Sequence, residues 1–204
     1  MSGLPGYLTL YPDDRALRRA LSDTATLTEL AREPMTASMD PDWRLALLEF
    51  EVAAVLPAAP ASTRHLLLLY GESVALSGDS RSPEPLDVTI YARGARWQGD
   101  AGIPLTLGAA DTRVLLQLTA RSDRHRVWAA LRPVVGSMVL FHEPGCEWLI
   151  QVINGAVQLR DARTLLELES GNVLRVDFSH ASAPARVVLD GGGELAMFKL
   201  TRAG

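Results

Sequence analysis

The sequence contains a single cysteine, Cys146, and a single lysine, Lys199, among its 204 residues. One cysteine excludes an internal disulfide framework and any zinc site built from several thiolates. The sequence also lacks an uninterrupted apolar run of about 18 residues, and its N-terminus has neither the basic start nor the apolar core of a signal peptide. We therefore expect a cytoplasmic protein that has no membrane as a partner.

Clustered positive charge is missing as well. The formal net charge is -4 and the isoelectric point is near 5.6. Proteins that bind nucleic acids neutralise phosphates with patches of Lys and Arg, and the best local candidate, residues 121–126, is short. We expect no nucleic-acid partner, and we attribute the excess of Arg over Lys to codon bias.

What the sequence does contain is a series of short strand-like segments. From residue 43 onward, eleven apolar or alternating runs are separated by Gly, Pro, Asp and Ser, which predicts an antiparallel sandwich or barrel. Helical spacing occurs only before this region, where Pro12 and the two following acids would cap a short N-terminal helix. The apolar side of this helix would consist of Ala16, Leu17, Ala20 and Leu21.

Two segments that lie 84 residues apart share one pattern, which predicts an internal duplication. Each segment is a six-residue apolar strand that begins after Arg64 or Trp148 and ends at Gly71 or Gly155. We expect each glycine to supply the positive φ of a tight hairpin. The predicted organisation is a helical lead-in over residues 1–40, a first barrel over residues 41–121 and a second barrel over residues 122–204.

The spacing around the second of these segments is similar to the first cupin motif, G-x5-H-x-H-x3-E-x6-G. Gly136, His142 and Gly155 stand at the expected places, but Pro144 replaces the second His and Trp148 replaces the Glu. The sequence therefore resembles an all-β double cupin that has lost most of its metal ligands. Two further replacements are Arg64 at the Glu position of the first segment and Ser182, instead of His180, at the His of the second cupin motif, which begins at Gly171.

Four further motifs follow one another along the sequence: Asp42-Trp43-Arg44-Leu45, Arg64 to Glu72, Trp97-Gln98-Gly99-Asp100, and Leu107-Gly108 leading into Val114 to Arg121. Their order and spacing, over about residues 25 to 200, resemble those of the HutD/Ves family. The resemblance implies a bacterial bicupin, in part associated with histidine utilisation, that is non-enzymatic or of unproven activity and senses or limits a small acidic metabolite. It supplies no catalytic residues. The Asn- and Gly-rich motif that the family carries near its start is replaced here by residues 21–31, which puts a histidine-pathway role in doubt.

Catalytic alternatives find little support in the sequence. A metal-dependent cupin enzyme would need His142, Glu143 or Glu147, and His180 as ligands, yet adjacent residues of a strand point to opposite faces and His180 misses the expected register. A histidine four residues before Cys146 would lower the pKa of a nucleophilic thiol, but nothing else in the sequence supports a Cys-His pair, so we expect a buried inert thiol. The run Gly191–Gly193 lies between two strands and is interpreted as a hairpin rather than a phosphate loop.

Binding of a small carboxylate is the function that we expect, with no metal and no cofactor. Arg64 is the first candidate because it occupies the inward position of the cupin Glu, where a guanidinium would hold a carboxylate through two parallel hydrogen bonds. Alternatively, Arg64 pairs with an acid, Arg44 pairs with Glu49 or Glu51, and the tryptophans belong to the core. A homodimer formed by sheet packing is a further alternative. The secondary candidates for the ligand site are Arg44, His65, Trp43 and Trp97.

Overall fold

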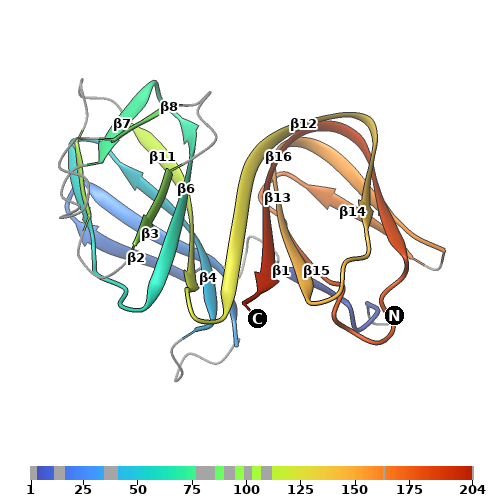
Figure 1. Ribbon diagram of the computed structural model, residues 1–204. Coiled ribbons are helices and arrows are strands. Elements are labelled where there is room, and N and C mark those ends of the chain that lie inside the picture. Colours follow the sequence, from blue (N-terminus) through green and yellow to red (C-terminus); the bar gives the residue numbers. More distant parts are fainter. Residues whose placement is uncertain are drawn as a thin grey trace. The chain divides into compact units, whose positions relative to one another are not determined.

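The chain folds into β-strands that gather in two compact units (Figure 1). A computed structural model describes residues 4–11, 17–34, 41–76, 86–89, 95–98, 103–106, 112–162 and 164–203. These residues form sixteen strands and no α-helix, so the all-β prediction is confirmed, and none of them belongs to a helix that could cross a membrane. We call Ala16–His125 the first unit, and Arg126–Gly204 together with Met1–Arg15 the second unit.

The predicted N-terminal helix is wrong. Leu17–Ser22 forms strand β2, which pairs antiparallel with β3 (Ala25–Glu33), and Leu21 packs against the core of the first unit. The helical spacing rested on four residues, and such a short pattern also fits a strand whose backbone hydrogen bonds come from a neighbour. The predicted cap at Pro12 lies outside the described residues.

The first unit consists of two antiparallel sheets with an apolar core that draws on both. One sheet has the order β2-β3-β4-β11-β6-β9 and the other has the order β5-β10-β7-β8. The core residues include Leu48 and Leu66 from the six-stranded sheet and Leu56 and Leu105 from the four-stranded sheet. The remaining strands are β4 (Trp43–Phe50), β5 (Ala53–Leu56), β6 (Ser62–Tyr70), β7 (Ser73–Leu76), β8 (Leu86–Thr89), β9 (Ala95–Gln98), β10 (Ile103–Thr106) and β11 (Arg113–Arg121).

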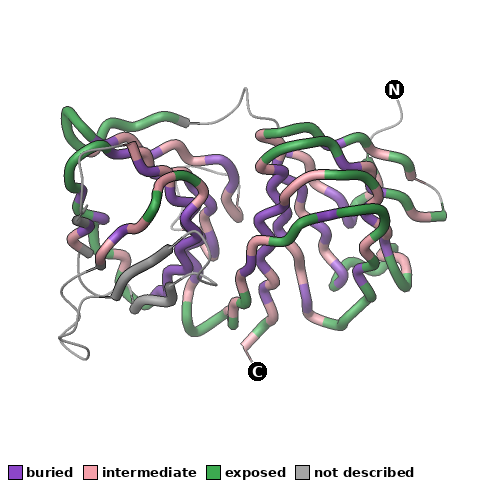
Figure 2. Tube along the Cα trace, turned by 90° about the horizontal axis from the view of Figure 1, so that it is seen from above, coloured by how far each residue is buried: buried purple, intermediate pink, exposed green. Residues whose placement is uncertain are grey.

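The second unit is built around three long strands, β12, β13 and β16, which bend strongly along their length (Figure 1). Its sheet has the order β1-β15-β13-β16-β12, with β14 paired to β13. Buried segments follow the inner sides of the strands in each unit (Figure 2). The strands are β1 (Leu8–Tyr11), β12 (His125–Phe141), β13 (Cys146–Arg160), β14 (Leu165–Glu169), β15 (Val173–Asp177) and β16 (Arg186–Arg202).

Three predicted glycine turns are not hairpins. Gly155 lies inside β13 and Gly191–Gly193 lies inside β16, where the glycines let two paired strands bend together. Gly155 has a φ of 81°, and a Cβ atom added to it would overlap the carbonyl oxygen of Gly192. Gly71 follows β6 and leads into β7, which lies in the other sheet of the first unit. A positive φ thus marks a bend as well as a hairpin.

The predicted lead-in is not a separate segment, because β1 completes the second unit. It pairs with β15, so that Leu8 lies opposite Val176 and Tyr11 lies opposite Val173. Leu8 and Tyr11 are 5% and 7% exposed. Residues from the two ends of the sequence therefore share one core.

Removal of β1 tests this arrangement. Residues 122–204 alone are expected to be less stable by about 3 to 6 kcal/mol, because burial of two large side chains contributes about 1.5 to 3 kcal/mol each. Addition of a peptide of residues 4–11 should raise the melting temperature of this fragment in circular dichroism. A peptide with Leu8→Ser and Tyr11→Ser is the control, and equal melting curves with both peptides would contradict the role of β1.

Candidate functional site

The candidate site lies on the six-stranded sheet of the first unit, where the register sets one residue from each of five neighbouring strands in a row. Directly opposed residues of antiparallel strands project from the same face. Three of the five residues are arginines, so this row brings positive charge together. It consists of Arg32 on β3, Arg44 on β4, Thr119 on β11, Arg64 on β6 and Trp97 on β9.

The row faces the interior of the first unit. Arg64 shares a face of β6 with Leu66 and Leu68, which belong to the core, because side chains two residues apart in a strand point the same way. Arg44 shares a face of β4 with the core residue Leu48 in the same manner. The arginines therefore extend the inner apolar surface toward the end of the sheet where β4 and β6 begin.

Arg64 is 1% exposed, yet its hydrogen-bonding capacity is mostly unused. Its Nη2 donates to the backbone carbonyl of Pro57, whereas Nε and Nη1 are buried with no hydrogen-bond partner among the described residues. Burial, with a smaller contribution from the charge of Arg44, lowers the pKa of the Arg64 guanidinium to about 10, so the group is charged at neutral pH. A buried cation with free donors is unfavourable until an anionic acceptor meets it.

Arg44 and Arg32 share one carboxylate, that of Glu29. The shortest nitrogen to oxygen distances are 3.9 Å from Arg44 and 3.5 Å from Arg32. Arg44 therefore pairs with an acid, as in the alternative above, but this acid is Glu29 rather than Glu49 or Glu51, and Glu49 contacts Arg18 at 3.6 Å. Two arginines of the row thus contact the same acid.

Sequence reasoning missed two polar residues beside Arg64. Gln117 and Thr119 lie on the same face of β11, and the Gln117 Nε2 donates to the Thr119 Oγ1 over 2.7 Å. The Gln117 Oε1 is buried and has no hydrogen-bond partner among the described residues. The available signal was a pair of polar residues, two apart, inside an otherwise apolar strand, since buried polar groups normally find partners.

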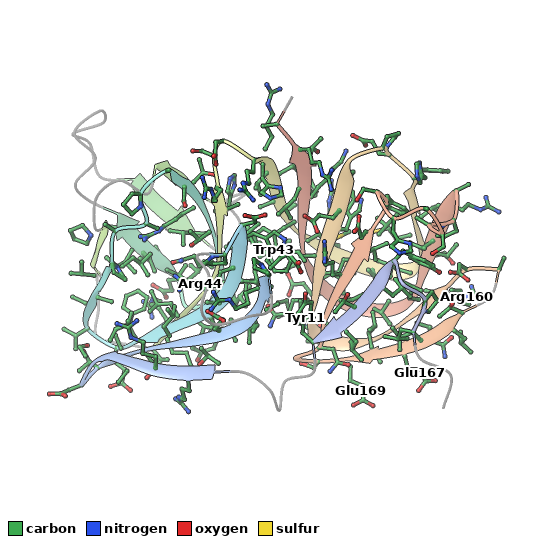
Figure 3. The ribbon with its side chains drawn as sticks, turned by 90° about the horizontal axis from the view of Figure 1, so that it is seen from below. Tyr11, Trp43, Arg44, Arg160, Glu167 and Glu169 are labelled. Carbon is green, nitrogen blue, oxygen red and sulfur yellow. The ribbon has the colours of Figure 1, made fainter. Side chains whose placement is uncertain are left out.

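Trp43 and His65 point away from this row. Trp43 precedes Arg44 on β4, and the two side chains leave the strand on opposite faces (Figure 3). His65 follows Arg64 on β6 and lies on the opposite face for the same reason. Trp43 is fully buried, which agrees with the alternative that it is a core residue. The side chain of Trp97 lies outside the described residues, and only its backbone pairing with Arg64 is known.

The residues of the metal-enzyme alternative are engaged with other side chains. Glu147 accepts a 2.6 Å hydrogen bond from Arg175, and Glu143 accepts one of 2.5 Å from Lys199. His180 is hydrogen-bonded to the hydroxyl of Ser182. Among the described residues, no three His, Cys, Asp or Glu side chains form a group that could hold a metal ion.

Cys146 is 1% exposed at the start of β13. Burial is the main cause that raises the pKa of its thiol to about 11, so the sulfur is protonated at neutral pH. A buried, protonated thiol is a poor nucleophile, because the thiolate is the reactive form.

Glu167, Glu169 and Asp190 line a pocket of about 410 Å³ in the second unit, and two of these three carboxylates have hydrogen-bond partners. Asp190 accepts a 2.5 Å hydrogen bond from Arg160, and Glu167 accepts one of 3.1 Å from Gln158. The row around Arg64 is therefore the better candidate for a ligand site.

The strand order and the absence of helices among the described residues define an all-β protein of two compact units. The sequence profile of the HutD family matches residues 24–197, and the chain belongs to this family. No functionally curated protein matches the sequence.

Solved structures share this fold at low sequence identity. PA5104 of Pseudomonas aeruginosa PAO1, a conserved protein of unknown function, is 17% identical with a TM-score of 0.78, and the match covers 97% of this chain and 100% of that chain. HutD of Pseudomonas fluorescens SBW25 is 16% identical with a TM-score of 0.72 and the same coverage. AerE of Microcystis aeruginosa is 9% identical with a TM-score of 0.65, and covers 93% of this chain and 97% of that chain. At such identities the likeness shows the fold alone.

Proposed function

We propose that this protein is a metal-free double cupin of the cytoplasm that binds a small carboxylate in its first unit and acts as a binding or regulatory protein. A single buried cysteine fits a reducing compartment. The ligand carboxylate pairs with Arg64, and Arg44 adds to the positive potential of the site.

The pattern of the two units supports a duplication. Arg64 on β6 and Trp148 on β13 lie 84 residues apart, and each is followed at two and four residues by side chains of its own unit's core. The sheet order β4-β11-β6 in the first unit corresponds to β12-β16-β13 in the second. Both units thus use the same face of equivalent strands as their interior.

The single observation that carries the binding proposal is the pair of free donors on Arg64. The parallel donor pairs of a guanidinium are Nε with Nη2 and Nη1 with Nη2, so a carboxylate would accept from Nε or Nη1 together with the second N–H of Nη2. On Arg64, the terminal nitrogen that donates to Pro57 is Nη2, and the two other nitrogens are buried without a partner among the described residues. The free acceptor Oε1 of Gln117 favours ligands that also carry a hydrogen-bond donor.

A thermal-shift screen of carboxylates tests the proposal. Formate, acetate, and larger mono- and dicarboxylic acids, including acids of histidine degradation, are compared at equal ionic strength. A ligand present at a hundredfold excess over its Kd should stabilise the protein by about 2.7 kcal/mol. The shift should vanish in Arg64→Ala and persist in Arg186→Ala, which changes an exposed arginine of the second unit.

Two outcomes would count against this function. One is the absence of any shift across the screen, or a shift that Arg64→Ala leaves intact. The other is stoichiometric metal in protein purified without added metal, lost on His142→Ala, which would favour the metal-dependent enzyme.

A further inference from the structure

A cluster of aromatic and cationic side chains lies in the second unit, away from any residue assigned above to carboxylate binding. Trp128 on β12 and Trp148 on β13 meet edge to face, with 5.9 Å between ring centroids and 78° between planes. The Lys199 Nζ lies 5.9 Å from the centroid of Trp148, and the guanidinium carbon of Arg132 lies 5.8 Å from the centroid of Trp128.

This cluster occupies the positions that correspond to the arginine row of the first unit. Trp148 takes the place of Arg64, and Trp128 lies 84 residues after Arg44, the offset that relates the two units. Lys199 is directly opposite Trp148 on β16, as Thr119 is directly opposite Arg64 on β11. The two units therefore place different chemistry at equivalent positions.

The cluster faces the interior of the second unit at one end of its strands. Trp148 packs against the core, and Lys199 shares a face of β16 with the core residues Leu195 and Met197. The rings of Trp128 and Trp148 thus lie at the end of the apolar interior, and the Lys199 ammonium lies beside Trp148.

The exposure of Trp128 indicates that the cluster is open to solvent. This side chain is 43% exposed, although indole is among the side chains that gain most from burial. Its neighbour Arg132 is exposed as well, and Lys199 is 25% exposed. The ring face beneath Arg132 is therefore accessible to a ligand that moves this side chain aside.

The charges around the two rings favour an anion. Lys199 and Arg132 contribute two positive charges, and Glu143, which binds Lys199 at 2.5 Å, contributes one negative charge. Glu143 is 50% exposed, so water can solvate its carboxylate when a ligand takes its place on Lys199.

We propose that Trp128, Trp148 and Lys199 form a second ligand site that binds a planar aromatic carboxylate. The ligand ring stacks on Trp128, with Trp148 holding that indole in place. The ligand carboxylate binds the Lys199 ammonium and exchanges with Glu143, and Arg132 covers the outer side of the ring.

Saturation-transfer NMR and calorimetry with three probes test this site on the full chain. Benzoate carries both the ring and the charge, cyclohexanecarboxylate carries the charge without an aromatic ring, and benzyl alcohol carries the ring without the charge. We expect benzoate to bind about tenfold more tightly than either other probe, because each of the other two lacks one of the two contacts, the stacked ring or the ion pair.

Variants assign the binding to these residues. Trp128→Ala and Lys199→Met should each weaken benzoate binding about tenfold, because each removes one of the two contacts. Trp128→Phe retains an aromatic ring, so it should keep most of the affinity and serves as the variant that folds if Trp128→Ala does not. Arg186→Met is the matched control for loss of an exposed cation in the same unit.

Arg64→Met separates this proposal from the proposed carboxylate site. Benzoate binding that persists in Arg64→Met and falls in Lys199→Met supports the second site, whatever the outcome of the screen on the first. Loss of benzoate binding in Arg64→Met, equal binding of benzoate and cyclohexanecarboxylate, or no saturation transfer at about 10 mM benzoate would each overturn it.

Discussion

Gly155→Ala is expected to lower the free energy of unfolding by about 3 kcal/mol or more, whereas Gly192→Ala changes it by less than about 1 kcal/mol. At Gly155 the φ of 81° disfavours any L side chain, and the new Cβ would also overlap the carbonyl oxygen of Gly192 on the paired strand. A backbone atom in a sheet cannot rotate aside as a side chain can. The paired strands must therefore separate where they bend.

Gly192 is the matched control, because it lies in the same bend and directly opposite Ala156. A Cβ added to Gly192 meets no heavy atom of the described residues within 4 Å. Urea denaturation followed by tryptophan fluorescence measures the free energy of unfolding of both variants. The comparison requires that this free energy depends on urea concentration with the same slope in both. Similar stabilities of the two variants would show that the bend does not depend on close backbone approach at Gly155.

Arg64→Met is expected to stabilise the ligand-free protein by about 1 to 3 kcal/mol while abolishing carboxylate binding. Methionine fills a similar volume, needs no hydrogen bond and removes the repulsion from Arg44. The small loss is the hydrogen bond to the Pro57 carbonyl. A gain in stability together with a loss of binding is typical of a residue retained for a ligand.

Arg113→Met provides the comparison, because Arg113 is equally buried but has partners. It is 3% exposed, and its guanidinium donates to the backbone carbonyls of Ser73 and Thr112. Removal of these donors should destabilise the protein by about 1 to 3 kcal/mol. If chemical denaturation shows that Arg64→Met is destabilised as strongly as Arg113→Met, Arg64 is a structural residue. That result would contradict the proposal that Arg64 is retained for a ligand.

The strand content and the side of each strand that faces the core can be predicted from the sequence, because both follow from the local alternation of apolar and polar residues. The alternation that sets Arg64 beside Leu66 and Leu68 is visible without a structure, as is the family resemblance. The pairing of strands cannot be predicted in this way, because it joins segments that lie far apart in the sequence. Nothing within Leu17–Ser22 identifies β3 as its partner, so the four-residue spacing predicts a helix where the structure has a strand. The predicted hairpin at Gly155 is wrong for a related reason, since a positive φ occurs in a bend as well as in a turn.

The candidate site was only partly predictable. Alternation separates Arg64 from His65 and Arg44 from Trp43, so two of the five candidates could have been placed on the other face in advance. The register that sets Arg44 level with Arg64 across Thr119 could not, because β4 and β6 meet only through β11. The buried acceptor on Gln117 depends on the same pairing.

The pairing of β1 with β15 has a consequence for the way the chain is made. β1 is synthesised before every strand of the first unit, yet its partner β15 is synthesised after all of them. The first unit can fold during translation, while the second waits for a contact between distant parts of the chain, which slows its folding. Until then β1 and β15 both present unpaired edges, which can exchange between nascent chains at high concentration. The refolding yield should therefore fall as the protein concentration rises, because strands of the second unit exchange between chains.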